Sequence, residues 1–343
     1  MLNRSFSSSF SKKGDTTTVL PSRYYIPGSE LTFCSKDKIG QGASGVVFAG
    51  TYMGKPVAVK QFSFDNPALP LNKELLLKEA AELVILDHDN IIKCYGVCQE
   101  QSSLILELAR RELLVDGKQC YVHSLRQLTE MAGDLPEETK HEALFQIANG
   151  LSYLHSRKIT HGDLKSANVL VTGSGHEVFF KLGDFGSAHA QLTSKLTTAN
   201  MTAISTQSRA GTTPFEAPEV FKNYQKTSKS DIYAFSMIMY ELQFPKLAHP
   251  WESVFGTQVR IDTLSALIIT AVQRGERPPV KNESPYTHLM KKCWDNLPEN
   301  RPTAFELKNE IVELHQVDYF VIFLSSSIII LTFLEISCIA FGV

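Results

Sequence analysis

The chain contains 343 residues, of which 43% are hydrophobic and 20% are charged, and its formal net charge is −2. This length is enough for one large two-lobed domain or two ordinary ones, and the composition is that of a globular protein. The small net charge gives no indication of a nucleic-acid partner or of binding to an anionic membrane surface. The six cysteines form no CxxC pair, which favours free thiols in a reducing compartment over a zinc site.

Residues 1–30 are rich in serine and threonine and contain no apolar stretch of signal-peptide length. We expect a disordered tail that can be phosphorylated, because such a polar segment buries too little apolar surface to offset the entropy of ordering. The early basic residues Arg4, Lys12 and Lys13 give the tail a weak likeness to a mitochondrial transit peptide, which is the less favoured alternative.

The rest of the chain divides into two regions of different pattern. Between residues 31 and 109, short β-branched and aromatic runs broken by Gly, Pro and Asn predict strands, with one helix at Leu71–Leu86. From about residue 136 helical periodicity dominates. The predicted fold class is therefore α+β, with a β-rich N-lobe at 31–106, a mainly helical C-lobe at 110–316 and a ligand-binding cleft between them.

A glycine-rich turn, Gly40-Gln-Gly-Ala-Ser-Gly-Val-Val47, follows the first predicted strand. Glycines allow a backbone to approach a polyphosphate closely. A dinucleotide-binding fold uses the same spacing, but it needs a helix directly after the last glycine. Here Val46–Ala49 and Val57–Val59 predict two more strands instead, which disfavours that fold.

Lys60 ends the second of these strands, where its ammonium group can point into the cleft and hold phosphate oxygens. Such a lysine needs a carboxylate to orient it. We expect Glu79 on the predicted helix to be that partner, with Glu82 and Glu74, about one helical turn away, as alternatives.

The segment Ile159–Val171 brackets a polar loop with two apolar runs. Within it, Asp163 can accept the proton of a substrate hydroxyl, and Lys165 can offset charge on a transferring phosphoryl group. Asn168 offers a neutral oxygen to Mg²⁺, which prefers oxygen ligands. Asp184 lies sixteen residues beyond Asn168, after another apolar stretch, so a hairpin would bring it beside Asn168 as a second metal ligand.

In this order and spacing, the motifs resemble the eukaryotic protein kinase family over about residues 31–316. The resemblance implies transfer of the γ-phosphate of ATP to protein substrates with Mg²⁺, or alternatively Mn²⁺. By the same resemblance, the expected catalytic residues are Asp163, Lys165, Lys60 and Glu79, and the expected metal ligands are Asn168 and Asp184.

The resemblance also implies a binding site for ATP between the lobes. The glycine-rich turn would cover the phosphates, Leu106 would be the gatekeeper, and the hinge at Glu107–Ala109 would receive adenine. The residues expected around ATP are Gly40, Gln41, Gly42, Ala43, Ser44, Gly45, Val47, Ala58, Lys60, Leu106, Glu107, Ala109 and Leu170.

Later motifs agree with the same family. Ala217-Pro-Glu219 would close an activation segment that begins at Asp184, with Arg301 as the buried ion-pair partner of the glutamate. Asp231 resembles the aspartate that braces the catalytic loop from a central helix. The side chains expected to stack as an apolar spine are Leu83, Cys94, His161 and Phe185.

Two features favour serine and threonine as acceptors: Lys165 two residues after Asp163, and the Gly211-Thr-Thr-Pro214 segment. The stretch Cys293–Pro302 is similar to the form shared by tyrosine kinases and tyrosine-kinase-like kinases. We therefore place the chain in the tyrosine-kinase-like group. The alternatives are a pseudokinase scaffold and a dual-specificity or tyrosine kinase.

Three positions depart from the family pattern. Gly162 replaces the arginine that usually precedes the catalytic aspartate and binds a phosphate on the activation segment, so activity is not expected to depend on such a phosphate. About a dozen residues at Arg110–His123 separate the hinge from the next helix and form either a specificity element or an inert insertion. Ser236 stands where glycine is usual, which we interpret as a packing variation.

The last residues of the chain are strongly apolar. Tyr319–Leu334 contains no charged residue, and only Glu335 interrupts the run to Val343. As a helix this run would be about 37 Å long, enough to cross a hydrocarbon core. We expect residues 318–343 to anchor a cytoplasmic kinase domain to a membrane, and an apolar extension packed on the domain is the alternative.

Overall fold

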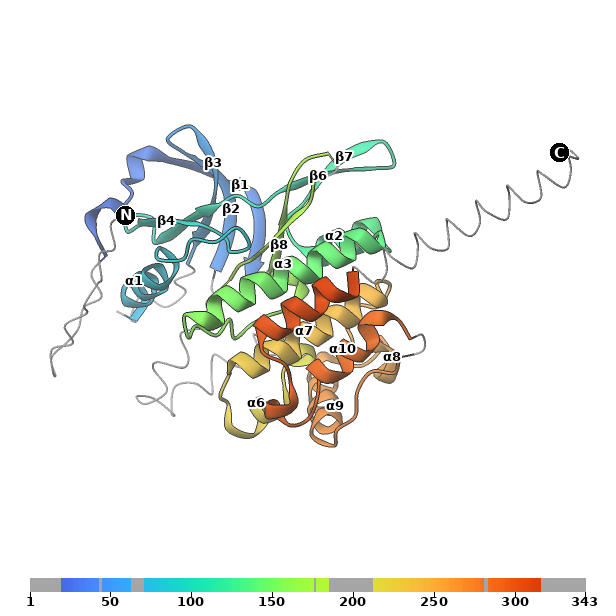
Figure 1. The fold of residues 1–343 in the computed structure, drawn as a ribbon. Coiled ribbons are helices and arrows are strands. Elements are labelled where there is room, and N and C mark those ends of the chain that lie inside the picture. The colour runs from blue at the N-terminus through green and yellow to red at the C-terminus, as the bar shows by residue number, and fades with distance from the viewer. Residues whose placement is uncertain are drawn as a thin grey trace, which may run out of the picture.

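The computed structural model describes residues 20–42, 45–62, 71–175, 177–184, 212–280 and 283–315. These residues form a small lobe built on a β-sheet and a larger helical lobe (Figure 1). The predicted α+β, two-lobed fold is confirmed.

The N-lobe is a five-stranded antiparallel sheet with one helix against it. Its strands are β1 (Leu31–Gly42), β2 (Gly45–Tyr52), β3 (Lys55–Gln61), β4 (Cys94–Cys98) and β5 (Ser103–Glu107), in the spatial order β1-β2-β3-β5-β4. Helix α1 (Leu71–Leu83) packs on β4 and β5 and ends three residues before the predicted Leu86. Because β3 lies at the centre of the sheet, any side chain near its end has a rigid base.

Residues 20–30 belong to the folded N-lobe, so the expected tail boundary at residue 31 is placed too late. Leu20 and Ile26 are each 4% exposed, and the backbone N–H of Ile26 donates to Val97 O of β4 at 2.8 Å. The hydroxyl of Tyr24 donates to Val84 O, just after α1. These few apolar side chains order the segment because β4 and α1 supply the other half of the buried surface.

After the hinge, the residues expected to be a specificity element or an inert insertion form a β-hairpin over 111–122. Strands β6 (Arg111–Val115) and β7 (Lys118–Val122) are joined by Asp116 and Gly117, both with positive φ (51° and 73°). A two-residue hairpin turn of this kind favours an Asp-Gly pair. The Arg111 guanidinium donates to Gly175 O and Glu177 O, and these contacts hold the hairpin against that later segment of the chain.

The C-lobe is built around one helix that is buried along nearly its whole length. This helix, α7 (Ser228–Gln243), has every side chain from Ser230 to Leu242 buried. Around it lie α2 (Leu125–Ala132), α3 (Glu137–Ser156), α6 (Pro218–Asn223), α8 (Glu252–Phe255), α9 (Ile261–Gln273), α10 (Pro285–Cys293) and a helix over 304–315.

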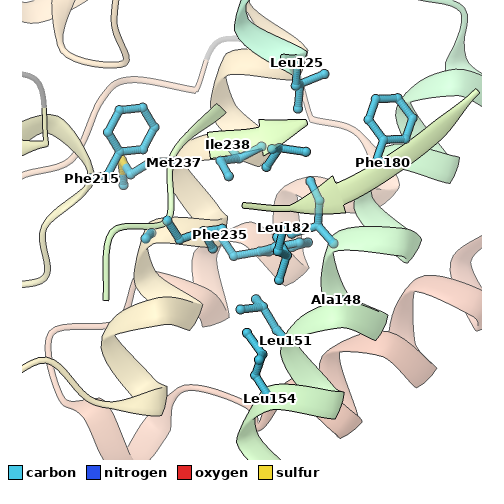
Figure 2. Packing of buried hydrophobic residues seen from close by; sticks show 14 of the residues in the cluster. Leu125, Ala148, Leu151, Leu154, Phe180, Leu182, Phe215, Phe235, Met237 and Ile238 are labelled. Carbon is cyan, nitrogen blue, oxygen red and sulfur yellow. The ribbon is translucent and has the colours of Figure 1, made fainter. Parts of the chain in front are cut away.

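A short hairpin of β8 (Val169–Thr172) and β9 (Phe179–Leu182) lies on α3 at the upper side of the C-lobe. Figure 2 shows side chains from α3, β9 and α7, among them Leu151, Leu182 and Phe235, meeting in one core. This packing fixes both ends of the hairpin relative to α7, and it thereby positions the residues just before and just after it.

No helix among the described residues is long and apolar enough to cross a membrane. The segment 318–343, for which an anchor was expected, lies outside those residues, as do residues 1–19.

The packing of residues 20–30 gives a first prediction. Replacing buried Ile26 by alanine removes apolar contacts with β4 and leaves a cavity, so it should lower the free energy of unfolding by about 2–4 kcal/mol. Urea denaturation would measure the change. Leu114→Ala in the β6–β7 hairpin is the control, because Leu114 is 76% exposed and should change stability by under about 0.5 kcal/mol. Equal stability of the two variants would contradict the observed packing.

Candidate active site

Lys60 of the N-lobe forms ion pairs with two carboxylates, one from each lobe. Its ammonium lies 3.0 Å from Glu79 Oε1 on α1 and 2.8 Å from Asp184 Oδ1 just after β9. Lys60 and Glu79 are only 6% and 2% exposed. Burial by itself would lower the pKa of Lys60, but the charges of Asp184 and Glu79 raise it above its ordinary value. Glu79, the expected partner, is thus in contact with Lys60.

The carboxylate of Asp163 is held in place by three donors. Lys165 Nζ lies 2.9 Å from Oδ2, Asn168 Nδ2 donates to the same oxygen at 2.9 Å, and the hydroxyl of Thr212 donates to Oδ1 at 2.8 Å. Lys165 also donates to the Thr212 hydroxyl at 3.1 Å. The Gly211–Pro214 segment was expected only to favour serine and threonine as acceptors, and the contact of Thr212 with Asp163 was not predicted.

The loop that carries Asp163 is fixed from below by Asp231 in the first turn of α7. The backbone N–H groups of His161 and Gly162 donate to the two Asp231 carboxylate oxygens, each at 2.9 Å. His155 Nε2 of α3 lies 2.8 Å from Oδ2. Gly162 has φ +75°, a left-handed conformation that glycine adopts without steric cost. The predicted bracing role of Asp231 fits this geometry.

The β8–β9 hairpin brings Asn168 and Asp184 together as its spacing suggested. Val169 pairs with Leu182, and the N–H of Gly183 donates to Asn168 O at 3.0 Å. Since the amide nitrogen of Asn168 is directed at Asp163, its carboxamide oxygen is the atom suited to a metal. Among the described residues no group of three or more His, Cys, Asp or Glu could hold a metal ion. The Asn168–Asp184 pair fits Mg²⁺ that takes its remaining oxygens from nucleotide phosphates and water.

The glycine-rich turn joins β1 and β2 over the end of β3. Gly40 pairs with Val47, Gln41 with Val46, and Gly42 with Gly45. A Cβ at Gly45, whose φ is +153°, would lie 2.1 Å from Gln61 O, so only glycine allows the start of β2 to lie this close to the end of β3. Ala43 and Ser44 at the tip lie outside the described residues.

The other residues expected around ATP line the junction of the lobes. Ala58 of β3 pairs with Leu106 of β5, and Glu107 Oε1 lies 2.9 Å from Lys181 Nζ of β9. Ala109 is buried, and its carbonyl oxygen lies 2.8 Å from His123 Nδ1. Leu170 of β8 approaches Gly183 closely, since a Cβ built there would lie 2.6 Å from Leu170 Cδ1.

Residues 33–312 match the protein kinase domain family. The chain is a member of the protein kinase family. It is 29% identical over 283 residues to a probable LIM domain-containing serine/threonine-protein kinase of Dictyostelium discoideum. The aligned region covers 82% of this chain and 39% of that protein.

Two further relatives support the same family. The probable serine/threonine-protein kinase drkD of Dictyostelium discoideum is 32% identical over 293 residues, covering 84% of this chain and 20% of its own length. Human mitogen-activated protein kinase kinase kinase 7 is 29% identical over 293 residues, covering 83% of this chain and 42% of its own. The chain thus spans less than half the length of each of these relatives. The three relatives are consistent with the tyrosine-kinase-like group expected from the sequence.

Two structural features of the kinase domain match their sequence expectations. Arg301 is 1% exposed and forms a two-pronged ion pair with Glu219 at 2.7 and 2.8 Å. Three of the four expected spine residues, Leu83, Cys94 and His161, are buried, and the fourth, Phe185, lies outside the described residues. Burial lowers the pKa of His161, which favours the neutral imidazole.

Glu241, near the end of α7, gives this kinase domain a testable pH dependence. Burial raises the pKa of Glu241 from 4.5 to about 7, although Arg126 lies 3.4 Å from its carboxylate. As the pH rises from about 4.5 to about 7, the unfolded chain releases this proton while the folded protein keeps it, so folding stability falls. Glu241→Gln should therefore gain stability relative to the wild type over this range, by up to about 3 kcal/mol.

Urea unfolding at pH 5 and pH 8 would measure that gain. The control is Glu283→Gln, whose side chain is 83% exposed and should give the same difference from the wild type at both pH values. A Glu241→Gln difference that does not grow with pH would contradict the effect of burial.

Proposed function

We propose that this chain is an ATP-dependent protein kinase that phosphorylates serine or threonine of protein substrates. The observation that carries the proposal is the placement of the Asp163 carboxylate beside Lys165 and Asn168, next to the Lys60–Asp184 pair. A base, two cations and two candidate metal ligands thereby converge at one edge of the cleft between the lobes. Such an arrangement suits phosphoryl transfer, which depends on positioning and on neutralising charge.

In the proposed reaction, the oxygen of a substrate hydroxyl attacks the γ-phosphorus of ATP, and the bond to the bridging oxygen of the β-phosphate breaks. Asp163 accepts the hydroxyl proton. Lys165 offsets negative charge on the transferring group, and Lys60, oriented by Glu79, holds phosphate oxygens. Asn168 and Asp184 would hold Mg²⁺, which neutralises charge on the phosphates when it is bound. The products are ADP and the phosphorylated substrate.

The preference for serine and threonine rests on the surroundings of Asp163. Lys165 and Thr212 both contact its carboxylate and each other, so they flank the position that an attacking hydroxyl must occupy. The printed names of two relatives, which describe serine/threonine-protein kinases, support the same preference.

The central test is the dependence of phosphate transfer on Asp163. With labelled ATP and a generic protein substrate, Asp163→Ala should lose about 10²- to 10⁴-fold in rate, because the base is removed. Binding of ATP, followed through the thermal midpoint of unfolding, should be retained. Asp87→Ala is the control, since its side chain is 92% exposed and should leave the rate unchanged. Equal transfer by Asp163→Ala and the wild type, or no transfer by either, would overturn the proposal and leave a scaffold function.

A separate proposal concerns residues 318–343, which we infer to anchor the domain, residues 20–315, to a membrane with the kinase on the cytoplasmic side. The uncharged run Tyr319–Leu334 supports it. Deletion of residues 318–343 should move the protein from the membrane pellet to the supernatant without loss of kinase activity. Recovery of the full-length protein in the supernatant after cell lysis would contradict an anchor.

A further inference from the structure

The glycine before Asp163 leaves room in the catalytic loop without loosening it. Gly162 has no side chain to reach the activation segment, yet its N–H still donates to Asp231. Beside Gly162 lies a small cavity of about 20 Å³, whose walls include Glu216 of the activation segment and Lys226 of the loop between α6 and α7. A cation, that of Lys226, thus lies at this cavity although position 162 supplies none.

Lys226 and Glu216 form an ion pair across this cavity. Lys226 Nζ lies 3.6 Å from Glu216 Oε1, and the two side chains are 21% and 13% exposed. Because both side chains are partly buried, solvent and salt screen their attraction less than that of an ion pair on the open surface. Glu216 also lies directly before Ala217-Pro-Glu219, so the pair holds the end of the activation segment that runs beside Asp163.

The Lys226–Glu216 pair completes a series of contacts that hold residues 212–219 without any phosphate. The other contacts join this stretch to the catalytic loop, to the residue just before α8 and to the loop before the last helix. They are Thr212 Oγ1 to Asp163 at 2.8 Å, Trp251 Nε1 to Pro214 O at 3.3 Å, and Glu219 to Arg301 at 2.7 Å.

We propose that Lys226 is a positioning residue that holds the substrate-binding end of the activation segment through Glu216, in place of an arginine at position 162 binding a phosphate. The inference rests on the proposed kinase function and concerns its regulation. The carboxylate of Glu216 provides the negative charge that a phosphate would otherwise add, and Lys226 of the α6–α7 loop provides the positive charge. The segment is therefore held in position whether or not it is phosphorylated.

Steady-state kinetics of Lys226→Met and Glu216→Gln test this role. If the pair positions the end of the activation segment that binds the protein substrate, each variant should raise KM for a peptide substrate about tenfold and leave KM for ATP within about twofold. Lys222→Met is the matched control, since Lys222 is an exposed lysine on neighbouring α6. The charge-reversed variant Lys226→Glu with Glu216→Lys should regain most of the loss. Unchanged peptide KM in Lys226→Met, equal effects on both KM values, or no recovery in the reversed pair would overturn the proposal.

Phosphatase treatment gives an independent outcome. The wild type should keep its activity after treatment, and the Lys226→Met variant should show the same raised peptide KM before and after it. Loss of wild-type activity that is restored only by rephosphorylating the activation segment would overturn the proposal. Absence of any Asp163-dependent transfer would instead overturn the proposed function itself, so the two failures are distinguishable.

Discussion

The placement of the catalytic loop depends on one buried carboxylate, that of Asp231. A buried charge is costly unless hydrogen bonds satisfy it, and this one, 2% exposed, meets two backbone N–H groups and a histidine ring. Its position in the first turn of α7 adds the favourable field of a helix N-terminus. Since α7 is buried along its length, the loop is attached to the part of the C-lobe least able to shift. The position of Asp163 follows from that attachment.

The N-lobe uses the same physical solution with the opposite charge. Lys60 is a buried cation, and it is tolerated because carboxylates from α1 and from the end of β9 compensate it. Three elements that are far apart in the sequence are therefore coupled at one atom. Movement of α1 away from the sheet would separate Glu79 from Lys60 and leave Lys60 with Asp184 alone. The two ion pairs therefore favour the arrangement in which α1 lies against the sheet.

The sequence was most informative where short motifs carry chemistry. Lys60, Asp163, Asn168 and Asp184 could be placed from spacing and from the family resemblance, because each lies at the end of a strand or in a loop of fixed length. The packing of residues 20–30 was missed, since Leu20 and Ile26 gain their buried surface from β4, about 70 positions later. The hydrogen bond from Thr212 to Asp163 was not predicted for a similar reason, because only tertiary folding brings the two residues together. The β6–β7 hairpin did carry a local signal, its Asp-Gly turn, but no long alternating pattern.

The β6–β7 hairpin limits which insertions and deletions can occur between the hinge and α2. Leu113 and Cys120 face each other on its partly buried side, and Leu114 and Gln119 on its exposed side. One residue added to a single strand would turn every later side chain of that strand to the opposite face, or force a bulge. Changes in length are therefore tolerated in matched pairs, one residue from each strand, so that related chains should differ here by even numbers of residues.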